Sequence, residues 1–95
     1  MATYIILSRF ASSDFKDSKA FKQIAADVSD RIKRECPKVT WRASYVTLGR
    51  FDAVDIVESA DASEVTRAAL IIRGHGHAFT ETLPAQEWNE FIARL

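Results

Sequence analysis

The sequence predicts an α+β fold in which strands and helices follow one another in the order β-α-β-β-α-β, with a short helix at the C-terminus. Three observations predict it. Two segments carry apolar residues at helical spacing, four segments have the composition and length of strands, and Gly49-Arg50 separates two of these strands by a short turn. The 95 residues, of which 47% are hydrophobic, are enough for one domain over residues 1–95 with a packed core.

The first predicted strand covers residues 3–10, which are rich in β-branched and aromatic side chains. This segment is apolar on both faces, as is typical of a central strand. Alternation along it gives two faces, one with Tyr4, Ile6, Ser8 and Phe10 and the other with Ile5, Leu7 and Arg9.

The first helix is predicted over residues 14–35, beginning between residues 14 and 18. Short polar side chains there can accept hydrogen bonds from the free N–H groups of the first turn. Apolar residues follow at i, i+3, i+4, i+7 and i+11, namely Phe21, Ile24, Ala25, Val28 and Ile32. Pro37 cannot continue a helix, so we expect the end near Glu35.

The second and third strands, residues 38–48 and 51–59, are expected to pair as an antiparallel hairpin. The two-residue connection Gly49-Arg50 favours a tight turn between them. Alternation predicts that Val39, Trp41, Ala43, Tyr45 and Thr47 share one face of the second strand. On the third strand we expect Val54 and Ile56 to face the helices, which places Asp55 on the opposite face.

The second helix is predicted over residues 61–73. Asp61 and Glu64 have the spacing of a capping box, and apolar residues follow at helical spacing. Gly74 is expected to end this helix, since glycine is favoured just beyond a helix C-terminus. Residues 75–83 then form the fourth strand, and Pro84 belongs to the first turn of the last helix.

Right-handed crossovers arrange these elements as a ferredoxin-like sheet with strand order 4-1-3-2 and both helices on one face. The first and third strands are apolar on both sides, so the other face of the sheet is expected to be a large apolar surface. We therefore predict a homodimer formed through this open face.

Composition excludes several classes of function. Thirteen basic and thirteen acidic side chains cancel, which disfavours binding to nucleic acid or to an anionic membrane. One cysteine cannot form an internal disulfide or a cysteine-rich zinc site, and no apolar run is long enough to span a membrane. With no signal-peptide pattern at its start, the chain is predicted to be cytoplasmic, and we expect neither a cofactor nor a metal.

The segment Tyr45-Val-Thr-Leu-Gly-Arg-Phe-Asp52, followed by Ala-Val-Asp-Ile-Val-Glu58, resembles the GYD-domain family. That family is named for a Gly-x-Tyr-Asp signature after a Tyr-x-Thr-Leu strand, and Phe51 stands here in place of the signature tyrosine. Residues 4–7 and 79–83 resemble the first and last strands of the family. The resemblance implies a dimeric α/β barrel built from ferredoxin-like domains, and it implies no particular activity.

Candidate ligand-binding residues are expected together on the open face of the sheet: Tyr45, Asp55, His77, Ser8 and Arg50. A carboxylate in the middle of a central strand, such as Asp55, must be paired, solvated or protonated. A half-polar, half-aromatic lining suits a small aromatic or quinone-like ligand, and it equally suits a partly hydrated dimer interface.

Two other motifs have ordinary structural interpretations beside functional ones. His75 and His77 point the same way on a strand and offer two metal ligands or a proton carrier, but they are also ordinary polar residues at a strand start. Asp52, directly after the turn, is expected to bind the backbone N–H groups of Gly49 or Arg50, or to pair with the side chain of Arg50.

Two functions remain open. The first is a small homodimeric protein that binds a ligand or a partner through the open face. The alternative is a small cofactor-independent enzyme of the monooxygenase or isomerase type, which rests on analogy of fold. A histidine with an Asp or Arg in an enclosed pocket would favour the enzyme, and a packed interior would favour the interaction protein.

Overall fold

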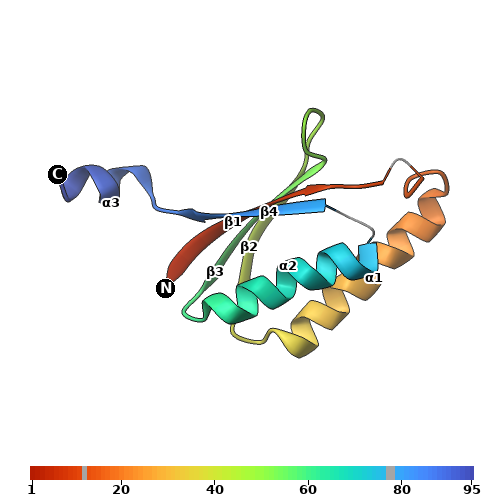
Figure 1. Cartoon of the computed structure of the whole chain (residues 1–95), viewed down its shortest axis with the longest axis horizontal. Helices are drawn as coiled ribbons and strands as arrows, with labels where there is room; N and C mark the ends of the chain where they lie inside the picture. The colour runs from red at the N-terminus through yellow and green to blue at the C-terminus, as the bar shows by residue number, and fades with distance from the viewer. Residues whose placement is uncertain (12, 77–78) are drawn as a thin grey trace.

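The computed structural model describes residues 1–11, 13–76 and 79–95. Its elements are β1 (Ala2–Arg9), α1 (Ser18–Glu35), β2 (Thr40–Val46), β3 (Ala53–Ser59), α2 (Ala62–Gly76), β4 (Phe79–Ala85) and α3 (Trp88–Ala93). The four strands form an antiparallel sheet with the order β2-β3-β1-β4, which confirms the predicted topology. Helices α1 and α2 lie side by side on one face of the sheet, and α3 extends past its end (Figure 1).

The hydrophobic core lies between the sheet and the two long helices. From the sheet it contains Ile6 and Val57, both fully buried, and α2 contributes most of the rest. The buried residues of α2 are Val65, Ala68, Ala69, Ile71 and Ile72. Since α2 supplies so many buried side chains, the core is centred beneath α2 rather than beneath α1.

Helix α1 begins and ends where the sequence predicts. The Asp17 carboxylate accepts hydrogen bonds from the backbone N–H groups of Lys19 at 3.0 Å and Ala20 at 3.3 Å, so it satisfies two donors of the first turn. At the other end the N–H of Cys36 donates to the carbonyl of Ile32, and the proline that follows ends the helix.

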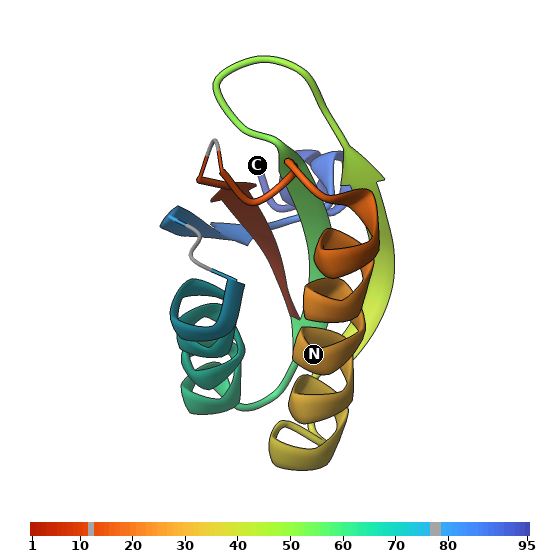
Figure 2. The ribbon, with the colours of Figure 1, turned by 90° about the vertical axis from the view of Figure 1, so that its right-hand side faces the viewer.

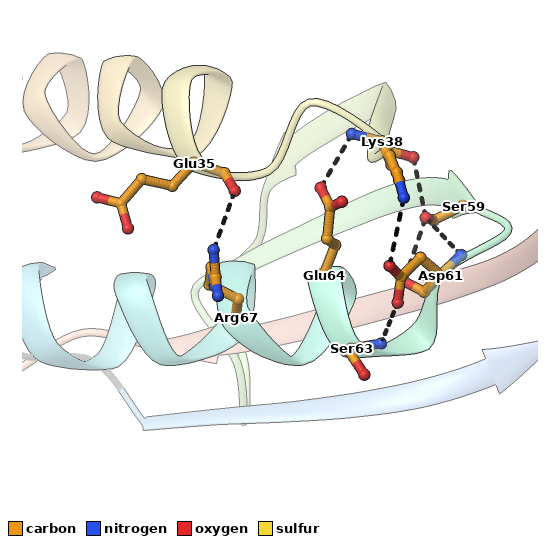
Figure 3. A network of polar contacts seen from close by, with 7 residues as sticks. All are labelled: Glu35, Lys38, Ser59, Asp61, Ser63, Glu64 and Arg67. Atoms are coloured by element: carbon orange, nitrogen blue, oxygen red, sulfur yellow. Dashed lines mark hydrogen bonds and ion pairs between the residues drawn. The ribbon is translucent and has the colours of Figure 1, made fainter.

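Hydrogen bonds join the start of α2 to the loop that follows α1 (Figure 3). Asp61 caps α2 by accepting from the N–H of Ser63 at 2.9 Å. Glu64 does not complete the expected capping box. Its carboxylate accepts instead from the backbone N–H of Lys38 at 3.0 Å, while the N–H of Asp61 donates to the hydroxyl of Ser59. The Glu64 side chain therefore joins two elements rather than closing its own helix end.

The connection between β2 and β3 is longer than the two residues predicted. The strands end at Val46 and resume at Ala53, so the loop covers residues 47–52. Within it the hydroxyl of Thr47 donates to the carbonyl of Phe51 at 2.7 Å, and the N–H of Thr47 donates to the carbonyl of Asp52. These bonds hold a wide loop. The backbone of Gly49 in this loop is not left-handed, and there is open space where a Cβ would be.

Asp52 holds the end of β1 rather than the turn. Its carboxylate accepts from the backbone N–H of Phe10 at 2.8 Å, and its own N–H donates to the carbonyl of Ser8 at 2.8 Å. The expected bonds to Gly49 or Arg50 are therefore wrong, because the wider loop carries Asp52 into register with the neighbouring strand. Asp52 extends the pairing of β1 and β3 by one step.

The second half of the chain differs from prediction at two boundaries. Gly74 does not end α2, which continues to Gly76, so His75 is helical and exposed rather than part of a strand. Strand β4 begins at Phe79 and includes Pro84, which was expected in the last helix. Proline is tolerated there because β4 is an edge strand, where a missing N–H removes no inter-strand bond on the outer side.

The register reverses the predicted faces of β3. Asp55 lies opposite Ile6, which is completely buried, whereas Val54 and Ile56 lie opposite Leu7 and Ile5. Residues directly opposite each other point to the same side of a sheet. Asp55 therefore faces the helices and Val54 and Ile56 face the open side, the opposite of the prediction.

An irregularity between Trp41 and Ala43 divides the predicted face of β2. Trp41 lies opposite the buried Val57, on the helix side, while Ala43 lies opposite Ile56, on the open side. A bulge inserts one residue into a strand and so shifts every later side chain to the other face. Trp41 and Tyr45 consequently lie on opposite faces of the sheet, although they are four residues apart.

Candidate functional site

The first candidate surface is the open face of the sheet. Apolar side chains from all four strands meet there: Ile5, Leu7, Tyr45, Val54, Ile56 and Leu83. An ion pair between Arg42 and Glu58, with 2.6 Å between Nε and Oε1, lies at its border. Neither α1 nor α2 reaches this side of the sheet (Figures 1 and 2).

Helix α3 adds a second exposed apolar group near the same surface. It projects beyond the sheet as a separate arm after β4 (Figure 1). Its large apolar side chains, with that of the C-terminal residue, are all exposed: Trp88, Phe91, Ile92 and Leu95. An isolated helix of six residues is not stable in water by itself, so its apolar face needs a covering surface.

The second candidate is a cavity of about 500 Å³ between α1 and the helix-covered face of the sheet. Its floor is made by side chains of the strands, among them Ser8, Trp41, Ser44, Ala53 and Asp55. Its roof is the apolar stripe of α1, formed by Phe21, Ile24, Val28 and Ile32. The floor consists largely of small side chains, so the stripe of α1 does not fill the space above them.

Polar groups gather on one part of this floor. One oxygen of Asp55, Oδ1, accepts from the hydroxyl of Ser44 at 2.6 Å and from the indole N–H of Trp41 at 3.2 Å. That N–H also lies 2.9 Å from the Ser44 oxygen. The hydroxyl of Ser8, whose residue is only 2% exposed, is buried without a hydrogen-bond partner in the described part of the chain.

The structure brings together two of the five predicted site residues. Ser8 and Asp55 both line the cavity, on the helix side of the sheet. Tyr45 lies on the open face, and Arg50 is exposed in the loop 47–52. His77 lies outside the described residues. The predicted grouping on the open face is therefore wrong for Ser8 and Asp55, because the register turns both toward the helices.

Sequence reasoning missed Trp41 and Ser44 as neighbours of Asp55. Trp41 shares the face of Asp55 through its pairing with Val57, and Ser44 lies opposite Asp55 because of the bulge after Trp41, which the alternation pattern does not reveal. The pairing of Ser8 with Ile6 on one face was visible in the sequence. Ile6 belongs to the buried core, and this was the signal that could have placed Ser8 beneath the helices.

Two groups near the end of α1 have shifted pKa values. A hydrogen bond from Arg31, at 2.7 Å, lowers the pKa of the Glu35 carboxyl, and desolvation only partly opposes it. Burial raises the pKa of the Cys36 thiol, and the negative charge of Glu64 raises it further. Cys36 lines the cavity and its thiol is neutral at physiological pH, so it offers a small apolar wall rather than a nucleophile.

Within residues 1–11, 13–76 and 79–95, no three His, Cys, Asp or Glu side chains lie close enough together to hold a metal ion. No helix in these ranges has the length and hydrophobicity needed to cross a membrane. The charged side chains that line the cavity are Asp14, Lys33 and Asp55.

These features define an α+β protein of the ferredoxin-like type with one uncovered sheet face. Solved structures share the fold. The crystal structure of FFRP-DM1 superposes with a TM-score of 0.57 at 23% identity and covers 90% of this chain and 100% of that chain. A de novo designed protein with a ferredoxin fold gives a TM-score of 0.55 at 11% identity, covering 92% of this chain and 86% of that chain.

The chain belongs to the GYD domain family, which matches residues 4–95. The resemblance found at residues 45–58 is thus confirmed over nearly the whole chain. A curated relative from Thermus thermophilus is 33% identical over 95 residues, which are 100% of this chain and 99% of the relative. That relative is named glutamine synthetase and cystathionine beta-lyase binding protein.

Proposed function

We propose that this protein is a homodimeric binding protein that holds another protein, an enzyme, and is not itself a catalyst. The observation that carries the proposal is the continuous apolar surface on the open face of the sheet. A surface built from all four strands of so small a protein is costly to leave in water and is typical of an interaction site. The relative named for the enzymes it binds supports the same class of function.

A second copy of the chain is the proposed occupant of the open face. The same chain carries both an apolar sheet and a projecting apolar helix, α3, and a two-fold dimer lets each α3 lie against the partner's sheet. Tyr45, with 60% of its surface exposed, and Leu83 then become buried at the interface. This arrangement gives the short α3 the covering surface that it lacks in one chain.

The dimer is tested by light scattering after size exclusion at micromolar concentration. The wild type is expected at twice the chain mass of 10.7 kDa. Ile56→Asp places a charge in the centre of the open face and is expected to give monomers with an unchanged circular dichroism spectrum. Leu70→Asp is the matched control, because Leu70 is exposed on α2, away from this face. A wild-type monomer, or a dimer unaffected by Ile56→Asp, contradicts the proposal.

The loop 47–52 is the proposed contact with the enzyme. It projects from the end of the sheet opposite α3 (Figure 1), and the proposed dimer leaves it free. Leu48 at 98% and Val46 at 83% are the most exposed of the large apolar residues near it, and Arg50 is exposed beside them. An exposed leucine next to an arginine suits a partner surface with an apolar pocket and a nearby carboxylate.

Surface plasmon resonance with purified glutamine synthetase and with cystathionine beta-lyase tests this contact. Binding of at least one enzyme is expected, and Leu48→Asp is expected to weaken it by at least about tenfold. Leu70→Asp serves again as the control. If Leu48→Asp binds as the wild type does, the loop is not the contact. If neither enzyme binds, the proposed partner class is wrong.

A further inference from the structure

We propose that the cavity between α1 and the sheet binds a small neutral molecule with an aromatic body and one hydroxyl group, such as a two-ring phenol. Its apolar walls and its few polar groups, which gather on one part of the floor, have the composition of a small-molecule site. The volume of about 500 Å³ lies within the range of about 300–1,000 Å³ that is usual for such sites.

The hydroxyl of Ser8 points to a ligand. Buried polar groups are nearly always hydrogen-bonded, and a buried hydroxyl without a partner costs stability. Ser8 is 2% exposed and lines the cavity, and its Oγ has no partner within residues 1–11, 13–76 and 79–95. A ligand oxygen that accepts from the Ser8 hydroxyl would remove this cost.

Asp55 supplies the complementary group. Both hydrogen bonds that it accepts from Ser44 and Trp41 end on Oδ1, and Oδ2 accepts no hydrogen bond within the described residues. Asp55 lies opposite Ile6, two residues before Ser8 on the same face, so Ser8 and Asp55 are diagonal neighbours. One hydroxyl can donate to the carboxylate and accept from the serine at the same time. A phenol fits both groups, whereas an ether or a carboxylate fits only one.

The remaining walls select an aromatic body. Phe10 and Phe21 meet edge to face with their ring centroids 5.2 Å apart, and both line the cavity. Trp41 is held in place by the hydrogen bonds of its indole to Ser44 and Asp55. Aromatic side chains that are fixed in this way pack well on a planar ligand.

Access to the cavity lies along α1. Ala25 and Ser29 are exposed residues of α1 that also line the cavity, so the space opens to solvent beside the helix. The cavity and the proposed dimer surface are on opposite faces of the sheet. This inference therefore does not rest on the proposed dimer or on the proposed enzyme partner.

Calorimetric titration of the wild type with 2-naphthol and with 2-methoxynaphthalene tests the site. The two probes share the ring system, and only the first has a hydroxyl donor. We expect 2-naphthol to bind at least about tenfold more tightly, in line with the loss of one hydrogen bond to a charged group. Failure of 2-naphthol to bind, or equal affinity for the two probes, overturns the proposal.

Two alanines on neighbouring strands give matched variants. Ala53 lies on the cavity floor opposite Ser8, and Ala43 lies on the open face opposite Ile56. Ala53→Leu is expected to abolish 2-naphthol binding by filling the cavity, while Ala43→Leu leaves it unchanged. The reverse result places the ligand on the open face and overturns the assignment.

The role of Asp55 is tested by Asp55→Asn, with Glu81→Gln as the control. Glu81 lies opposite Leu7 on the open face, so the same change of carboxylate to amide occurs outside the cavity. Asp55→Asn is expected to reduce the preference for 2-naphthol from about tenfold to about twofold or less. An unchanged preference shows that Asp55 does not contact the hydroxyl.

Amide chemical shifts of the wild type keep the test decisive if a variant fails to fold. Addition of 2-naphthol is expected to move the resonances of α1 and of the cavity floor, and to leave loop 47–52 unmoved. Shifts confined to open-face residues, or none at all, overturn the proposal.

Discussion

Two buried serines show that the two ends of the helix-covered face of the sheet differ in their hydrogen bonding. Ser59, fully buried at the end of β3, has its side-chain hydroxyl hydrogen-bonded. Its oxygen accepts from the N–H of Asp61 at 3.0 Å and lies 2.9 Å from the carbonyl of Lys38 and 3.2 Å from that of Asp61 (Figure 3). Ser8, at the other end of the sheet, is also buried, and its hydroxyl has no hydrogen-bond partner among the residues that the structure describes.

The helices above these serines differ in the same way. Over residues 62–75, helix α2 buries five residues. It approaches β3 and β4 closely, and Arg73 near its end donates to the hydroxyl and the carbonyl of Thr80. Helix α1 buries Ile32 alone among its described residues, and the rest of its stripe is half-buried above the cavity. Buried side chains are therefore concentrated beneath α2, while a cavity remains beneath α1.

The largest contrast is expected between two isoleucines of these helices. Ile71→Ala on α2 removes a side chain from the closed core and should cost about 2–5 kcal/mol of unfolding free energy. Ile24→Ala on α1 enlarges a cavity that already exists and should cost less than about 1.5 kcal/mol. Urea unfolding of both variants measures the difference. Equal costs would show that α1 packs as tightly as α2.

The two serines should respond with opposite signs. Ser59→Ala leaves the N–H of Asp61 and a carbonyl without a partner and should cost about 1–3 kcal/mol. Ser8→Ala removes a buried hydroxyl that has no partner, so it should be neutral or stabilise the fold by up to about 1 kcal/mol. Thermal unfolding of the two variants is the measurement, and a destabilised Ser8→Ala variant would contradict the contrast.

A smaller effect is expected at Gly74, inside the last turns of α2. The position is exposed and has open space for a Cβ, so Gly74→Ala should stabilise the helix by about 0.5–1 kcal/mol. Gly49→Ala provides the comparison outside a helix. Its backbone is not left-handed, and the change in its unfolding free energy should stay within about 0.5 kcal/mol. Substantial destabilisation of either variant would contradict these descriptions of the two glycines.

The smallest effect is a pH dependence of the unfolding free energy that arises at Cys36, where the closed core and the cavity meet. It is expected only above neutral pH. Burial raises the pKa of this thiol in the folded chain above that of the unfolded chain, which is about 8.5. The protonated thiol therefore contributes its full stability below about pH 8.5, and this contribution falls as the unfolded chain ionises above that pH.

Urea unfolding between pH 7 and pH 10 of the wild type and of Cys36→Ala isolates this contribution, since other titrating groups cancel in the difference. The difference in unfolding free energy between the wild type and Cys36→Ala should decrease as the pH rises above about 8.5. A constant difference across this range would show that water reaches the thiol through the cavity.

Local sequence determined most of the architecture. The apolar stripe from Phe21 to Ile32 and the proline at position 37 define α1, and the capping residue Asp17 lies within the predicted starting range. The strand composition and the handedness of the crossovers define the order of the sheet. These features depend on neighbouring residues and on general chirality, so a sequence contains them directly.

Boundaries were less well determined where local and tertiary preferences compete. Gly74 is a favourable helix end, but α2 continues past it, and Arg73 within this stretch is held by Thr80 of β4. The loop 47–52 is wider than Gly49-Arg50 predicts, and Asp52 in it bonds to the end of β1. In both places partners that are distant in sequence outweigh the turn signal.

The sequence alone determined that this chain alternates two sets of side chains along each strand, that its sheet is apolar on both sides, and which family it belongs to. Only the tertiary structure decided which set faces the helices. Alternation is symmetric between the two faces, and a bulge or a shift of one residue exchanges them. The register of Asp55 with Ile6 therefore placed Ser8 and Asp55 in a cavity under α1 rather than on the open face, and the bulge after Trp41 brought Ser44 opposite Asp55.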